Sequence, residues 1–201
     1  MSTGKTIAFF DFDGTITTQD TMFVFFKYAK GTWMYYFYMM LLSPVFVLFK
    51  LKLLPGQIAK EISLIVLFKG IYKEELNRVG KEFCVFKIDG IIRPKAWEKI
   101  LWHREHGHEV YIVSASAEEW LRPWTETKEL NLICTSLRYD ENGKFTGRID
   151  GKNCNGKEKV CRIEEKINLK EYDTIYAYGD TSGDKDMLSI ATFGEFRPFR
   201  D

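Results

Sequence analysis

Two aspartates, Asp11 and Asp13, stand one residue apart directly after the apolar segment Thr6–Phe10, in the stretch KTIAFFDFDGTITTQD. An apolar run of this length is typical of a strand that is covered on both faces. Two like charges at the end of such a strand repel each other, so their placement requires a compensating cation. Because carboxylate oxygens are the ligands that Mg²⁺ prefers, the pair predicts a magnesium site.

Polar residues also end two further apolar segments. Ser114 lies near the end of EVYIVSAS, residues 109–116, and Asp180 follows TIYAYG, residues 174–179, with Asp184 four residues later. In open parallel sheets, ligands bind at the carboxyl ends of the strands. We therefore expect Ser114 and Asp180 to meet Asp11 and Asp13 at one edge of a sheet, with Asp180 near the metal.

The elements that would position these side chains alternate along the chain. Helical patterns at 93–107, 118–130 and 156–167 separate the three strands, and Asn142-Gly143 marks the turn of a hairpin. Such alternation predicts an α/β fold with a parallel, doubly wound sheet. Residues 21–88 form one long, mostly helical block between the first and second strands.

Four short motifs in a fixed order carry a resemblance to a known family. They are DFDGTIT, IVSAS, the lysine of NGKEKV and YGDTSGDKDM. Together they resemble the haloacid dehalogenase superfamily of phosphohydrolases, and the inserted helical block resembles its phosphoserine-phosphatase-like branch, subfamily IB. The layout of 20–88 is also similar to that of bacterial phosphatidylglycerophosphatase C. The resemblance implies a Rossmann-like catalytic core at 1–20 and 89–201 with a helical cap at 21–88.

The resemblance implies roles for the acidic residues. Asp11 would be the nucleophile that forms an aspartyl phosphate. Asp13 would be the general acid and then the general base, and its backbone carbonyl would bind Mg²⁺ beside Asp11 and Asp180. Asp184 would be a further ligand or a nearby acceptor.

The same resemblance implies a phosphate-binding group. Ser114 and the amide of Ala115 would hold phosphoryl oxygens, and Lys157 would neutralise the crowded anions. Lys159 is a rival two residues further on; we prefer Lys157 because it begins the helix.

Alternatives to a phosphatase are constrained by the same motifs. A dehalogenase of the superfamily lacks the second aspartate, so Asp13 argues against it, whereas a phosphomutase keeps both aspartates. A phospho-accepting receiver module is shorter and has no cap. Within the phosphatases, a lipid phosphate such as phosphatidylglycerophosphate and a soluble small metabolite both remain open as substrates.

The composition bounds partners and location. The 201 residues suit one domain, or one domain with an insertion. The formal net charge of +1 gives no indication of nucleic-acid binding, and we expect no nucleic-acid partner. The four cysteines contain no CxxC pair and the N-terminus has no signal-peptide pattern, so we expect reduced thiols in a cytoplasmic protein. The three histidines in HREHGH are interpreted as a helix end and a strand start rather than a metal site. Oligomeric state is left open.

The block 21–88 is unusually basic and contains an uncharged run, residues 33–49, interrupted by Pro44. The block has ten Lys and Arg against four Asp and Glu, a local charge of +6. The run is expected to form a buried helical hairpin. The alternative is a lipid-facing element, which would bring the cap into peripheral contact with the inner face of a membrane.

Overall fold

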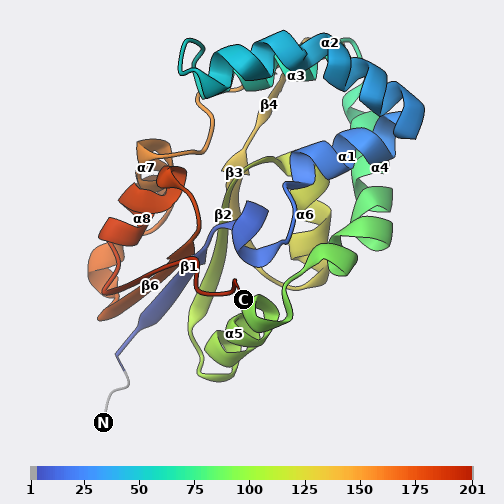
Figure 1. The fold of residues 1–201 in the computed structure, drawn as a ribbon. Helices are drawn as coiled ribbons and strands as arrows, with labels where there is room; N and C mark the ends of the chain where they lie inside the picture. Colours follow the sequence, from blue (N-terminus) through green and yellow to red (C-terminus); the bar gives the residue numbers. More distant parts are fainter. Residues whose placement is uncertain (1–3, 201) are drawn as a thin grey trace.

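The computed structural model describes residues 4–200 and contains a five-stranded parallel sheet. Its strand order is β3 (Asn131–Thr135), β2 (Glu109–Ala117), β1 (Thr6–Phe10), β6 (Thr174–Gly179) and β7 (Phe193–Phe196). Strand β1 is central and pairs in parallel with β2 and β6, so the residue that follows it lies in the middle of the carboxyl edge (Figure 1). The predicted α/β class with a parallel sheet is confirmed.

Helices cover both faces of the sheet because the central strand is apolar on both. Ala8 and Phe10 belong to a hydrophobic cluster with α5 (Pro94–Glu105) and α6 (Glu118–Thr127). Ile7 and Phe9 point to the other face, where α7 (Lys157–Lys166) and α8 (Lys185–Ser189) supply Ile163 and Met187. The alternation of side chains along β1 thus builds both layers.

Four α-helices lie in the block 21–88, which we call the cap: α1 (Thr21–Lys30), α2 (Thr32–Lys50), α3 (Gly56–Phe68) and α4 (Lys73–Phe83). They do not form a separate core, because the cluster that holds Phe10 continues through Phe25 and Phe68. At Gly80 on α4 an added Cβ would lie 1.9 Å from the carbonyl oxygen of Glu119, so α4 and α6 approach more closely than any side chain would allow.

The predicted hairpin is present and extends the cap. It consists of β4 (Leu137–Tyr139) and β5 (Phe145–Ile149), paired antiparallel. Glu61 of α3 is buried and accepts hydrogen bonds from Arg148 Nη1 at 2.8 Å and Ile149 N at 3.1 Å. Shorter helical turns complete the chain: Phe12–Ile16, Cys84–Ile88, Asp89–Ile91, Leu169–Glu171 and Ser182–Asp184.

The expectation of a buried helical hairpin at 33–49 is wrong. These residues belong to the single helix α2, which lies on the outside of the cap, and its one buried residue is Leu42 (Figure 1). Pro44 does not break the helix, although it cannot donate to the carbonyl of Met40. The hydroxyl of Ser43 donates to that carbonyl instead, at 2.8 Å. By length and composition alone, α2 is a candidate membrane span.

The three histidines lie at the end of α5 and just before β2, as expected. His103 is buried, with Nε2 2.9 Å from the hydroxyl of Tyr178 and Nδ1 2.8 Å from Nδ1 of His108. Burial lowers the pKa of His103 to about 3, so the ring is neutral at physiological pH. The neutral ring of His103 therefore joins α5 to β6 through its hydrogen bond with Tyr178.

Candidate active site

The turn after β1 places its two aspartates in different surroundings. Asp11 N donates to the carbonyl of Tyr178 at 2.9 Å, which continues the strand pairing to the edge of the sheet. The turn then passes Gly14, whose φ of +85° favours glycine. A Cβ there would lie 2.7 Å from Oδ2 of Asp180, so the glycine also lets the turn approach that carboxylate.

Three buried carboxylates meet at this edge. Oxygens of Asp11, Asp180 and Asp184 lie within 4.8 Å of one another, and all three residues are buried. The hydroxyl of Thr15 lies 2.9 Å from Asp11 Oδ2 and 3.1 Å from Asp180 Oδ1. A cluster of hard oxygen donors with excess negative charge fits Mg²⁺, which binds through a few carboxylates and retains several waters.

The buried cation at this cluster is Lys159, not Lys157 as expected. Lys159 Nζ donates to Asp11 Oδ1 at 2.6 Å, to Asp184 Oδ1 at 2.7 Å and to the carbonyl of Val113 at 2.8 Å. These three bonds use all three donors of the ammonium group. Lys157 is exposed at the first position of α7, so it contacts none of these carboxylates.

The helical period explains this correction. Residues that are two positions apart on an α-helix differ in direction by about 200°, so Lys157 and Lys159 point to nearly opposite sides. Lys159 instead shares its face with Ile163, four residues later, and that face packs on the sheet. The position of Lys159 on the apolar face was the sequence signal for its burial.

Burial and charge act against each other in this group. Burial alone would lower the pKa of Lys159, but the carboxylates of Asp11 and Asp184 outweigh it and raise the pKa. Burial raises the pKa of Asp11 to about 7, although Lys159 opposes the shift. For Asp184, burial is outweighed by Lys159 and by hydrogen bonds from Thr181, so its pKa is lowered. Asp11 is therefore the carboxylate that gains most from another nearby cation.

Asp184 is already held tightly by its neighbours. Besides Lys159, its Oδ2 accepts from the backbone N–H groups of Asp180 and Thr181 and from the hydroxyl of Thr181, at 2.9–3.1 Å. These bonds form the capping box of the turn Ser182–Asp184. Asp184 thereby fixes the backbone that carries Asp180.

Asp13 lies outside the cluster of three carboxylates and faces the cap. Its Oδ1 accepts from Thr21 N at 2.7 Å and Thr21 Oγ1 at 2.5 Å. Its Oδ2 accepts from Ser116 Oγ at 2.7 Å and Ser114 Oγ at 3.2 Å. Three hydroxyl groups and one backbone N–H group therefore hold the Asp13 carboxyl group in place.

The second motif supplies one fully buried residue, Ser114, and two residues that line the cavity, Ala115 and Ser116. Ser114 is fully buried, and its Oγ accepts from Ser116 N at 2.9 Å. Ala115 and Ser116 line the cavity beside Asp13. Ser116 was missed from the sequence, although the spacing Ser-Ala-Ser offered two hydroxyls rather than one.

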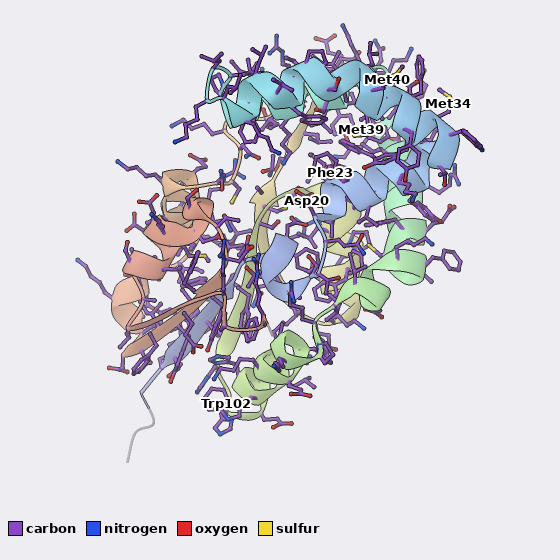
Figure 2. The ribbon with its side chains drawn as sticks, viewed as in Figure 1. Asp20, Phe23, Met34, Met39, Met40 and Trp102 are labelled. Carbon is purple, nitrogen blue, oxygen red and sulfur yellow. The ribbon has the colours of Figure 1, made fainter. Side chains whose placement is uncertain are left out.

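A cavity of about 500 Å³ lies between these residues and the cap. Asp11, Asp13 and Lys159 lie on its sheet side, with Asn153 and Asn155 beside them. The cap contributes an apolar wall from α1 and α2 (Met22, Phe23, Phe46 and Phe49), and Figure 2 labels Asp20 and Phe23 where α1 begins. The size suits a small molecule or the head of a larger one.

Lys60 is the charged residue that the cap places in this cavity. Its Nζ donates to the carbonyl of Ala115 and, at 3.1 Å, to Asn153 Oδ1. Burial lowers its pKa, and the nearby carboxylates of Asp13 and Asp20 oppose that effect. Sequence reasoning missed Lys60 because nothing local distinguishes it from the other lysines of the cap.

The C-terminal residues contribute to the same edge of the sheet. Arg200 pairs with Oδ2 of Asp180, and Arg197 Nε donates to the Asp180 carbonyl at 3.0 Å. Phe199 is buried between them and stacks on Phe10, with ring centroids 6.2 Å apart. The segment therefore helps to orient Asp180.

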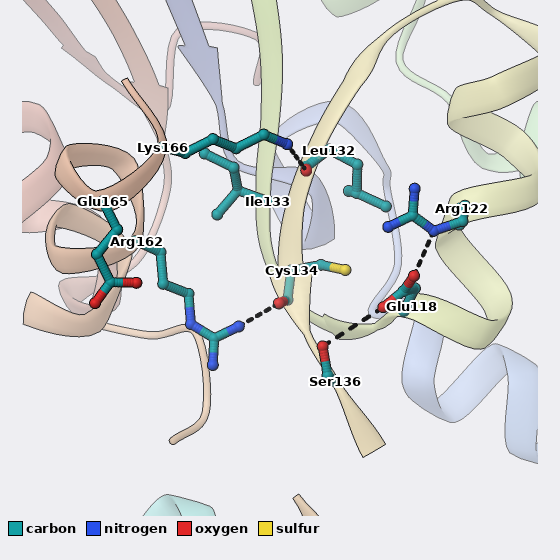
Figure 3. Close-up of a pocket in the computed structure, with 9 residues that line it drawn as sticks. All are labelled: Glu118, Arg122, Leu132, Ile133, Cys134, Ser136, Arg162, Glu165 and Lys166. Carbon is teal, nitrogen blue, oxygen red and sulfur yellow. Dashed lines mark hydrogen bonds and ion pairs between the residues drawn. The ribbon is translucent and has the colours of Figure 1, made fainter. Parts of the chain in front are cut away.

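A second cavity, of about 330 Å³, lies away from the carboxylates, between α6, β3 and α7 (Figure 3). Two arginines that line it have partners: Arg122 pairs with Glu118, and Arg162 donates to the carbonyl of Cys134. Lys166 donates to the carbonyl of Leu132 at 3.1 Å.

An α/β core with a buried acidic cluster at the carboxyl edge and a cavity under helices defines a hydrolase-type site. Residues 8–189 match the haloacid dehalogenase-like hydrolase family, and the chain belongs to that family. It is also 31% identical over 192 residues to Protein CicA of Caulobacter vibrioides, covering 95% of this chain and 85% of that protein. The expected hydrolase class is therefore confirmed.

Solved structures agree on the fold. A Bordetella pertussis protein of unknown function superposes with a TM-score of 0.81 at 22% identity, covering 94% of this chain and 88% of that one. A phosphoserine phosphatase solved as a phospho-aspartyl intermediate analogue gives a TM-score of 0.62 at 22% identity, covering 96% and 85%. These neighbours share the α/β fold of this chain.

Proposed function

We propose that this chain is a Mg²⁺-dependent phosphomonoester hydrolase that acts through an aspartyl phosphate on Asp11. The observation that carries the proposal is that Asp11, paired with Lys159, and Asp13, held by hydroxyl groups, face one cavity. A fixed anionic nucleophile beside a carboxyl that can exchange a proton is what two-step phosphoryl transfer requires.

Each residue has a defined task in this proposal. Asp11 attacks phosphorus while Lys159 holds its Oδ1 and offsets the added negative charge. Asp13 donates a proton to the leaving oxygen and later removes one from the attacking water. Mg²⁺ would be held by Asp11, Asp180 and the backbone carbonyl of Asp13, and would neutralise charge on the phosphoryl group.

The remaining polar groups support the phosphoryl group. Ser116 and the amide of Ala115 are placed at the cavity to contact its oxygens, and Ser114 supports them from behind. Asp184 acts mainly as a positioning residue, since both of its oxygens already accept hydrogen bonds.

The substrate class includes lipid phosphates such as phosphatidylglycerophosphate and soluble small metabolites. The apolar cap wall and the resemblance to phosphatidylglycerophosphatase C favour the first. Phosphoserine is disfavoured because its carboxylate would be held best by an arginine of the cap. Arg78, the arginine of residues 21–88, is exposed, pairs with Glu82 at 2.8 Å and does not line the cavity. The proposal places the protein in the cytoplasm, at the inner face of the membrane when the substrate is a lipid.

The proposal is tested by the dependence of rate on the leaving group. Asp13→Asn cannot protonate a departing alkoxide, so hydrolysis of an alkyl phosphate should fall by about 10²–10⁴-fold. The rate of phosphorylation by nitrophenyl phosphate should fall much less, because nitrophenolate is a good leaving group that needs no proton from Asp13. The measurement is the burst of the first turnover with saturating Mg²⁺, repeated with EDTA.

Two outcomes would contradict this assignment. One is an equal loss of the first-turnover rate on both substrates. The other is a rate in EDTA equal to the rate with Mg²⁺.

Lys60 is expected to act in binding more than in chemistry. Lys60→Met removes a cationic hydrogen-bond donor from the cavity, and such bonds are worth about 1.5–3 kcal/mol, so KM should rise at least about tenfold. We expect a smaller change in kcat, because Lys60 contacts none of the cluster carboxylates. The measurement is the separate determination of KM and kcat on the best phosphomonoester found.

Lys69→Met is the matched control, because Lys69 ends α3 on the exposed surface and does not line the cavity. A KM that is equally changed in both variants, or a loss confined to kcat in Lys60→Met, would remove Lys60 from substrate binding.

A further inference from the structure

Helix α2 is apolar on two sides, and only one of them packs against the rest of the cap. Its inner side packs on the cap through residues at helical spacing: Tyr35, Tyr38, Met39, Leu42, Val45 and Phe46. Its other side carries a second set at the same spacing, which we call the outer face: Trp33, Tyr36, Phe37, Met40, Leu41, Val47, Leu48 and Leu51. All members of the outer face are exposed.

The exposure of this face is extreme for large apolar side chains. Trp33 is 90% exposed, and Met40 is 67% exposed. Figure 2 shows Met34 and Met40 on the side of α2 that is turned away from the cap, and Met39 on the side toward α1. A contiguous apolar stripe of this kind marks a surface for another apolar phase.

The charges around the outer face select the kind of partner. Residues 21–60 contain no Asp or Glu, but they contain five lysines. Lys27 and Lys30 lie in the last turn of α1, next to one end of α2, and Lys50 and Lys52 lie at its other end. Lysines beside an apolar, aromatic-rich helix face complement an anionic lipid surface.

We infer that the outer face docks the protein on an anionic lipid bilayer, with α2 lying in the interface. A spanning arrangement is disfavoured because the inner side of α2, including the buried Leu42, would have to leave the core that it packs against. Its 19 residues extend about 28 Å, slightly less than the ~30 Å hydrocarbon core. Docking is a property of this surface and does not depend on the proposed chemistry.

Docking would also bring the cavity close to lipid. Phe46 and Phe49 of α2 line the cavity, and the outer face lies on the same helix, so a membrane that contacts the outer face would lie near the cavity. This geometry would give a lipid phosphate access to the cavity, which adds support to the lipid substrate class of the proposed function. The docking itself can be tested without any substrate.

The test uses the full chain and large unilamellar vesicles that contain no phosphomonoester. Wild-type protein should sediment with phosphatidylcholine vesicles that contain phosphatidylglycerol, and much less with phosphatidylcholine alone or at high salt. Brominated acyl chains should quench tryptophan emission, and Trp33→Phe should lose most of that quenching. Because no turnover is involved, a failure here leaves the hydrolase assignment standing.

Two matched pairs of variants locate the effect. Phe37→Gln with Met40→Gln should weaken vesicle binding at least about tenfold, since two large side chains no longer enter the interface. The control is Val85→Gln with Phe86→Gln, which removes two apolar side chains of similar exposure from the turn Cys84–Ile88. This control should leave vesicle binding unchanged. For charge, replacing Lys27, Lys50 and Lys52 by Gln should weaken binding about fivefold per lysine. Replacing Lys152, Lys170 and Lys185 by Gln should leave vesicle binding unchanged.

Three results would overturn the inference. The first is an absence of sedimentation with anionic vesicles at low salt. The second is equal binding by the Phe37 and Met40 double variant and its control. The third is a wild-type dimer in solution that the double variant dissociates, because a second copy of the chain would then cover the outer face.

Discussion

Replacing Lys159 with glutamine is expected to lower both activity and stability. The Lys159 ammonium is buried and donates to Asp11 and Asp184, so Lys159→Gln leaves two buried carboxylates without their cation. Breaking a buried ion pair in this way costs about 3–5 kcal/mol of unfolding free energy. Loss of one preorganised electrostatic contact should also lower kcat by about 10²–10³-fold.

Lys157→Gln is the matched control, since it makes the same substitution two residues earlier on the same helix. Lys157 is exposed and contacts none of the cluster carboxylates, so its variant should keep wild-type kcat and stability. Urea unfolding in EDTA measures stability without help from a cation, and initial rates with Mg²⁺ measure kcat. If Lys157→Gln loses activity while Lys159→Gln keeps it, the placement of α7 is wrong.

Asp11→Asn is expected to abolish turnover while the protein remains folded. The amide has nearly the shape of the carboxylate and can still accept from Lys159, but it cannot attack phosphorus. Loss of a nucleophile that acts together with its neighbours typically costs at least about 10³-fold. Because burial raises the pKa of Asp11, removing its charge should not reduce the melting temperature substantially.

Asp173→Asn supplies the control for this substitution. Asp173 is exposed and precedes β6, at the opposite edge of the sheet from the site, so its variant should retain full activity. Wild-type turnover by a freshly purified Asp11→Asn protein, with the amide verified by mass spectrometry, would refute the covalent mechanism.

The catalytic edge of the sheet could be predicted because its signals are local. A short apolar strand followed by Asp11 and Asp13, and another followed by Asp180, specify both the strand and the site at its end. Strand β7 was not predicted, because FGEF is exposed throughout and has no apolar run. Its position depends on pairing with β6, which is a tertiary property.

The parts of the site that were missed depend on tertiary structure. Lys60 and Arg200 reach the site from a cap helix and from the C-terminal segment, so no short motif contains them together with Asp11. Lys159 could have been found from the apolar face that it shares with Ile163. The choice of Lys157 instead relied on position along the chain rather than on the side of the helix.

The exposure of α2 could not be predicted from composition. Its sequence is apolar on both sides, so hydropathy alone does not say which side the cap covers. A helix that is apolar all round is usually buried, which made a buried hairpin the natural interpretation. The packing of the cap shows instead that one side has no partner among the described residues.

The central claim is that Asp11 becomes phosphorylated, and trapping that intermediate tests it most directly. Asp13→Asn should still be phosphorylated by nitrophenyl phosphate but should dephosphorylate slowly, since the amide introduced at this position cannot activate water. Acid quenching during turnover, followed by proteolysis and mass spectrometry, should find one phosphoryl group on the peptide that contains Asp11, removable by hydroxylamine. Release of nitrophenol with no modified peptide, or with the phosphoryl group on any other residue, would contradict the account.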